Sequence, residues 1–187
     1  MSRVANELLH PLRRFRPSLD ADFEQVAPEE MPEALRGLLV HTGDMTSRLE
    51  ALHQSRIALE VLHAGAGEGG AYCREVLLKN ASTGRAVEYG AIEIFLEAFE
   101  PLLRTQILEG KIPLGGLLNT NGVRYRSEPQ AYFRVCEGAG MHVLMEAASG
   151  AWLYGRCNVL RTETGALLAR IVEVLPPVAK GSVCEGI

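Results

Sequence analysis

The sequence is poor in aromatic residues and lacks the spacings that commonly bind metal ions. Phenylalanine, tryptophan and tyrosine make up only 6% of the 187 residues. The four cysteines form no Cys-x-x-Cys pair and the five histidines form no His-x-x-x-His pair, so the common zinc patterns are absent. We therefore expect no metal site, and reduced thiols at Cys73, Cys136, Cys157 and Cys184.

Long apolar runs and dense positive charge are also missing. No apolar run reaches the roughly 18 residues of a membrane span, and no basic start leads into an apolar segment, so we expect neither a span nor a signal peptide. The formal net charge is −4, and Arg13, Arg14 and Arg16 form the only dense basic cluster. These features favour a cytoplasmic monomer or homodimer with a small-molecule partner, and argue against a nucleic-acid or membrane partner.

The composition supports one hydrophobic core. Apolar residues make up 47% of the chain, and neither an internal repeat nor a low-complexity tract divides it. We expect a single domain over residues 1–187, with a core at about 29–177, an N-terminal arm at 1–28 and a loose tail at 178–187.

Apolar periodicity predicts helices first, and then strands joined by hairpins. Helices are expected over 29–41, after the N-cap Asp44, and over 100–109, while 112–118 reads as a tight turn or a close approach to a ligand. Strands are expected over residues 56–62, 72–79, 86–96, 123–136, 150–160 and 166–175. Hairpins favour an α+β fold with a single antiparallel sheet and helices packed on one face.

The strand over residues 72–79 places one charge on an apolar face. Tyr72, Arg74, Val76 and Leu78 alternate onto the same side. A guanidinium cannot lose its charge, so burial of Arg74 requires an anion from the protein or from a ligand.

The final strand presents the opposite charge, because Glu173 shares a face with Ile171 and Leu175. Three interpretations stay open: a buried Arg74–Glu173 ion pair, one strand read in the wrong register, or a pocket between the two residues. In the pocket interpretation Arg74 binds a ligand carboxylate and Glu173 meets a hydroxyl at the other end.

Four motifs, by their order and spacing, resemble the chorismate lyase family, and most closely its 4-hydroxybenzoate synthase branch. The resemblance spans roughly residues 35–177. The motifs are DMTSRLE at 44–50, CREVLL at 73–78, IPLG at 112–115, and LYGR at 153–156 followed by VEVLP at 172–176.

The resemblance implies a chorismate lyase-like fold and an enzyme that eliminates pyruvate from chorismate to give 4-hydroxybenzoate, without a cofactor. By the same resemblance Arg74 holds the ring carboxylate and Glu173 meets the ring hydroxyl, and both are the candidate catalytic residues. Further substrate-binding residues implied by the motifs are Met45, Thr46, Leu114 and Gly115.

Two segments depart from the family pattern. Residues 88–94 differ from the better-known lyases, which carry an arginine near there, and residues 124–134 match poorly. Two alternatives therefore stay open. One is an enzyme of the same fold acting on another small cyclic carboxylated metabolite. The other is a non-catalytic ligand-binding module, since a similar fold serves as the effector domain of some transcription regulators. Such regulators also need a basic helix-turn-helix domain, for which this acidic chain has no room.

Overall fold

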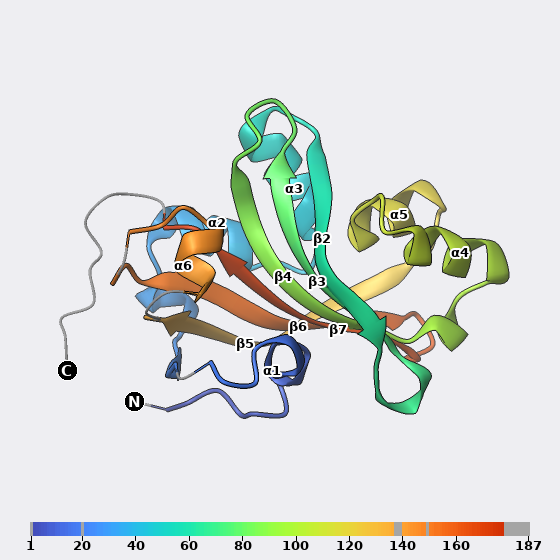
Figure 1. The fold of residues 1–187 in the computed structure, drawn as a ribbon, viewed down its shortest axis with the longest axis horizontal. Helices are drawn as coiled ribbons and strands as arrows, with labels where there is room; N and C mark the ends of the chain where they lie inside the picture. The colour runs from blue at the N-terminus through green and yellow to red at the C-terminus, as the bar shows by residue number, and fades with distance from the viewer. Residues whose placement is uncertain (1, 20, 137–139, 149, 178–187) are drawn as a thin grey trace.

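The protein folds around a single seven-stranded antiparallel sheet, as a computed structural model of residues 2–19, 21–136, 140–148 and 150–177 describes (Figure 1). The strand order is β1-β5-β6-β7-β4-β3-β2. The strands are β1 Phe23–Gln25, β2 Ile57–Ala66, β3 Tyr72–Asn80, β4 Ala86–Ile94, β5 Tyr125–Val135, β6 Leu153–Thr162 and β7 Leu167–Leu175. The α+β class with one antiparallel sheet is therefore confirmed.

The predicted hairpins join β3 to β4 and β6 to β7. In the first turn, the side-chain oxygen of Asn80 accepts hydrogen bonds from the backbone amides of Ser82 and Thr83, at 2.9 and 3.1 Å. Gly84 follows with φ of +74°, a left-handed conformation that glycine adopts without strain. These turns fix the register that places Arg74 opposite Ile92.

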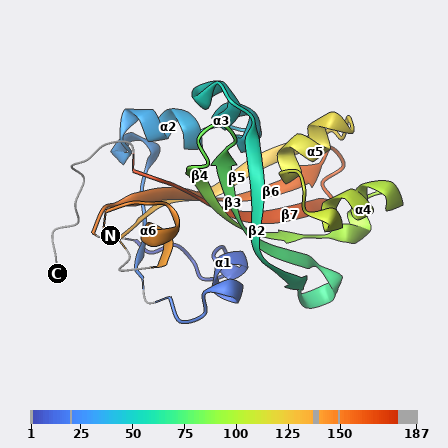
Figure 2. The ribbon, with the colours of Figure 1, turned by 45° about the horizontal axis from the view of Figure 1, so that its top comes forward.

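Helices cover both faces of the sheet. Four lie on one face and pack against it in two apolar clusters (Figure 2): α2 Glu33–Leu39, α3 Met45–His53, α4 Pro101–Glu109 and α5 Leu114–Thr120. The shorter α1 His10–Phe15 and α6 Gly140–Leu144 pack on the opposite face. The prediction of helices on one face thus holds for α2 to α5, whereas α1 and α6 depart from it. Short 3₁₀ turns complete the connections at Pro28–Glu30, Glu68–Gly70 and Leu96–Ala98.

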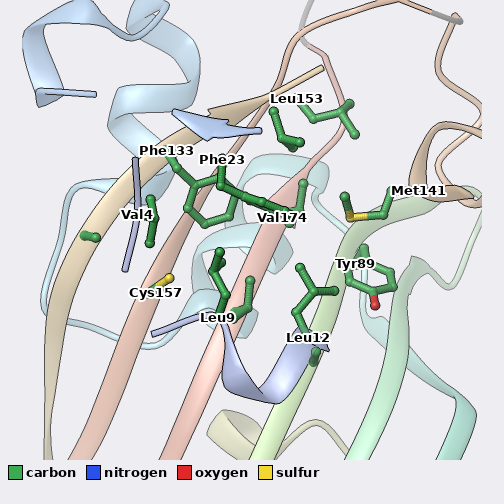
Figure 3. Close-up of a cluster of buried hydrophobic side chains, with 14 of the residues drawn as sticks. Val4, Leu9, Leu12, Phe23, Tyr89, Phe133, Met141, Leu153, Cys157 and Val174 are labelled. Atoms are coloured by element: carbon green, nitrogen blue, oxygen red, sulfur yellow. The ribbon is translucent and has the colours of Figure 1, made fainter. Parts of the chain in front are cut away.

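The N-terminal segment belongs to the core. Leu9 and Leu12 are fully buried beside Tyr89 (Figure 3). In the same cluster Phe23 meets Phe133 edge to face, with ring centroids 5.3 Å apart. From the expected N-terminal arm at 1–28, the side chains of Val4, Leu9, Leu12 and Phe23 pack in the cluster on the face of the sheet that α2 to α5 leave open. The expected loose tail, 178–187, lies outside the described residues.

Two local expectations change. Residues 112–118 were expected to form a tight turn or to approach a ligand closely. Most of them form α5, because Leu114, Leu117 and Leu118 are buried and their packing offsets the weak helix propensity of the two glycines. Cys73 and Cys157 are buried free thiols, whereas Cys136 is disulfide-bonded, so the expectation of reduced thiols is wrong at that position. Across the described ranges, no helix has the length and apolarity that crossing a bilayer requires.

Candidate ligand-binding site

A buried cavity lies between the sheet and the ends of α3 and α5. The volume of the cavity is about 70 Å³. One buried water needs about 10–15 Å³ on the same measure, so the cavity has room for several. Val76, Gly90, Ile92 and Ile171 line it from the sheet. All the residues that the sequence predicted for the site also line it: Met45, Thr46, Arg74, Leu114, Gly115 and Glu173.

Arg74 is the charged residue at one end of this cavity. It is 2% exposed, and its Nη1 donates one long hydrogen bond, 3.5 Å, to the carbonyl oxygen of Ile107. Within the described ranges no carboxylate pairs with it, and its buried Nε has no hydrogen-bond partner. Burial lowers the pKa of Arg74 to about 10, so the guanidinium stays protonated at neutral pH. A buried cation without a counter-charge favours an anionic ligand.

Glu173 does not pair with Arg74, so the ion-pair interpretation is wrong. Its partner is Arg156, which faces it directly across β6 and β7 and donates from Nε. Nη1 of Arg156 also donates to the carbonyl oxygens of Leu39 and His41, at 2.9 and 3.1 Å. Arg156 therefore donates to acceptors within the protein. Arg74 and Glu173 lie two strands apart in the sheet and are offset by two residues along the strands, so their Cα atoms are roughly 12 Å apart.

Glu88 is a second carboxyl in the cavity, and the sequence did not predict it as a site residue. It is 4% exposed, and in the part of the chain that the structure describes its buried Oε2 has no hydrogen-bond partner. Burial and the nearby Glu173 carboxylate raise the pKa of Glu88 well above its ordinary value, against a smaller opposing effect of Arg156. These surroundings favour the protonated form of the Glu88 carboxyl.

The roof of the cavity depends on a contact between α3 and α5. As predicted, Asp44 is the N-cap of α3, and its Oδ1 accepts from the amide of Ser47 at 2.7 Å. Its Oδ2 accepts from Nδ2 of Asn119 at 2.9 Å. A Cβ at Gly115 would lie 3.0 Å from the Cβ of Asp44, so glycine permits this approach. The contact brings Met45 and Leu114 over the cavity.

Other polar side chains that line the cavity form hydrogen bonds within the protein. Nδ2 of Asn158 donates to Oγ of Ser127 at 2.9 Å. Burial, with smaller contributions from Asp44 and Glu173, raises the pKa of Tyr125 to about 12, so the phenol stays neutral. Among the described residues, no group of three or more His, Cys, Asp or Glu side chains is placed to hold a metal ion.

Arg156 and Glu88 are charged residues of the cavity wall that sequence reasoning did not predict as site residues. The alternation along β6 places Arg156 and Asn158 on one face, and that along β4 places Glu88 on the face of Gly90 and Ile92. A charge on an apolar face was the signal that identified Arg74, and the same signal was present for Glu88.

The chain matches no protein-family model and no curated protein by sequence. It is similar in structure to PhnF from Mycobacterium smegmatis, with a TM-score of 0.57, 12% identity, and coverage of 90% of this chain and 94% of that chain. The effector domain of PhnF from the same organism gives a TM-score of 0.55 and 12% identity, over 72% of this chain and 88% of that chain. Both are likenesses of fold, and they agree with the chorismate lyase-like arrangement expected from the sequence.

Proposed function

We propose that the protein is a ligand-binding module whose cavity takes a small organic anion, with one carboxylate on an apolar body the size of a single ring. The observation that carries this proposal is Arg74, a buried guanidinium that lacks a carboxylate partner among the described residues. A ligand carboxylate would give it charge-assisted hydrogen bonds that no side chain in the described ranges supplies.

The apolar floor and the charges of the cavity support the same ligand. Between Arg74 and Glu173 the floor consists of Val76, Gly90 and Ile92, which suits the face of a ring. Arg156 is the other cation of the cavity, and it already donates hydrogen bonds to the Glu173 carboxylate and to two backbone carbonyl oxygens. Within the described ranges, Arg74 is therefore the cation of the cavity wall that lacks a carboxylate partner.

Binding without turnover is the favoured role because Glu173 is not poised as a base. Its carboxylate accepts from Arg156, and abstraction of a proton would weaken that buried ion pair. The likeness in fold to an effector domain supports a role in holding a ligand.

The second candidate function is the lyase reaction that the family resemblance implies. The lining of one cavity by Arg74, Glu173 and Met45 favours it. In that reaction the C3–O bond of chorismate breaks, and the proton from C4 passes to the methylene carbon of the enolpyruvyl group. The enolpyruvyl group leaves as pyruvate with the ether oxygen, and the ring becomes aromatic. The test is incubation with chorismate at high protein concentration, and release of pyruvate and 4-hydroxybenzoate would establish the lyase.

Calorimetric titration with benzoate and 4-hydroxybenzoate tests the favoured role. We expect binding by the wild type and a loss of about 100-fold in affinity for Arg74→Ala, because the charge-assisted bonds to the carboxylate disappear. The matched control is Arg124→Ala, since the Arg124 side chain is 81% exposed and lies outside the cavity. Equal affinity of Arg74→Ala and wild type would refute the proposal.

A further inference from the structure

Glu88 lies next to the part of the cavity floor that Gly90 leaves without a side chain. It is two residues from Gly90, which pairs with Val76 on one side and Glu173 on the other. A Cβ at Gly90 would lie 3.0 Å from Cγ2 of Val76 and 3.6 Å from Oε1 of Glu88. The Glu88 carboxyl is therefore folded over the Gly90 backbone, toward the centre of the cavity.

The cations of the site do not neutralise Glu88. Arg156 donates to Glu173 and to two backbone carbonyls, and Arg74 lies four residues along the strand pair from Glu88, roughly 14 Å away between Cα atoms. Oε2 of Glu88 is buried and has no hydrogen-bond partner in the described ranges, and the Glu173 carboxylate is nearby. Both features favour the protonated form of Glu88. A neutral carboxyl has one O–H donor, which a carboxylate lacks.

We infer that Glu88 is a specificity-determining residue: as a neutral acid, it donates a hydrogen bond to an uncharged oxygen at the end of the ligand far from Arg74, and it excludes ligands with a second carboxylate there. This inference rests on the proposed function, and it adds the chemical class of the ligand.

The two carboxyls suit a hydroxyl group. A hydroxyl can donate to the Glu173 carboxylate, which is ion-paired with Arg156, and accept from a protonated Glu88, so both of its hydrogen-bonding capacities are used. A second ligand carboxylate at that end would face two acidic side chains, and Arg156 already pairs with one of them, Glu173, which disfavours it.

The test is a calorimetric titration at pH 7 with three probes: 4-hydroxybenzoate, benzoate and benzene-1,4-dicarboxylate. For the wild type we expect 4-hydroxybenzoate to bind about tenfold more tightly than benzoate, and the dicarboxylate to bind more weakly than both. Glu88→Gln retains a neutral donor and should keep this ranking, whereas Glu88→Leu has no donor and should lose most of the preference for the hydroxyl.

The matched control is Glu93→Gln. Glu93 is also a buried carboxyl on β4, but it contacts Arg170 and does not line the cavity. This variant should give the wild-type ranking.

A direct measurement keeps the inference testable if a Glu88 variant folds poorly. Infrared spectroscopy of the ligand-free wild type at pH 7, with carboxyl carbons labelled in glutamate, should show a protonated carboxyl that is absent from Glu88→Gln. Ionisation of Glu88 at pH 7, or equal affinity of the wild type for the dicarboxylate and for 4-hydroxybenzoate, would overturn the inference and leave the proposed function standing. If neither monocarboxylate binds, the proposed function fails and this inference fails with it.

Discussion

Adjacent residues of β3 place opposite charges on opposite faces of the sheet, and the two charges have different surroundings. Both oxygens of Glu75 are engaged: Arg16 and Tyr89 donate to Oε1, each at 2.6 Å, and His63 lies 2.7 Å from Oε2. Arg74, on the cavity face, has no such set of partners in the described part of the chain.

The same contrast occurs on β4. Tyr89 donates its hydroxyl to Glu75, while its neighbour Glu88 has a buried oxygen that finds no partner among the described residues. Burial alone would raise the pKa of Glu75, but hydrogen bonds from Tyr89, His63 and Arg16 outweigh it and lower that pKa. The buried charge of Glu75 is therefore fully partnered, whereas on the cavity face the Arg74 guanidinium has no carboxylate partner in the described ranges.

The largest effect on stability is expected at Glu75. Replacement by alanine leaves the buried Tyr89 hydroxyl and the Arg16 guanidinium without their acceptor, so Glu75→Ala should lower the free energy of unfolding by about 3–5 kcal/mol. Urea denaturation measures the change. Affinity for 4-hydroxybenzoate should stay within about twofold of wild type while the variant is folded. A cost below about 1 kcal/mol would show that the network on this face contributes little.

Arg74→Met should have the opposite consequence for stability. It removes a desolvated charge that lacks a compensating carboxylate, so the free energy of unfolding should stay the same or rise by about 1–2 kcal/mol. The same urea experiment measures it. Destabilisation comparable to that of Glu75→Ala would mean that the guanidinium has a structural partner, and the contrast between the faces would disappear.

Glu88 should make the wild type less stable as the pH rises. Its pKa is raised in the folded protein, so between the ordinary value of 4.5 and the raised value the native state holds a proton that the unfolded state has released. Stability falls with increasing pH across this window. Glu88→Gln removes the ionisation, so the variant should gain stability relative to wild type as pH rises from 5 to 8, which thermal melts can follow. A constant difference between the two proteins over that range would contradict the assignment.

The smallest effect is expected at His41. Burial, with contributions from Arg156 and Arg48, lowers the pKa of His41 from 6.5 to about 4. The unfolded state therefore takes up a proton first as the pH falls through 6.5, and stability is lost. Between pH 7 and 6 this amounts to about 0.7 kcal/mol. His41→Asn, which keeps an acceptor for the Gly43 amide, should lose this part of the pH dependence in urea titrations. An unchanged dependence would assign it to another group.

The alternation of side chains was enough to locate much of the site from the sequence. A period of two along β3 and β7 placed Arg74 and Glu173 on apolar faces, and both line the cavity. Asp44 was identified as an N-cap because aspartate before a helix commonly accepts from the first-turn amides, as it does here. These predictions rest on local geometry, which neighbouring residues largely determine.

What the sequence did not reveal depends on contacts between distant segments. The partner of Glu173 is Arg156, and strand pairing between β6 and β7 decides that choice. The helix α5 forms despite Gly115 and Gly116 because its leucines pack on the sheet and because Asn119 reaches Asp44. Such pairings are set by the register of the whole sheet, which a period of two does not specify.

The hydrogen bond between Asp44 and Asn119 has a consequence for kinetics. It joins the beginning of α3 to α5 over the cavity, so a ligand whose exit separates these two helices also has to break this bond. Such a ligand would dissociate more slowly than its modest number of contacts suggests.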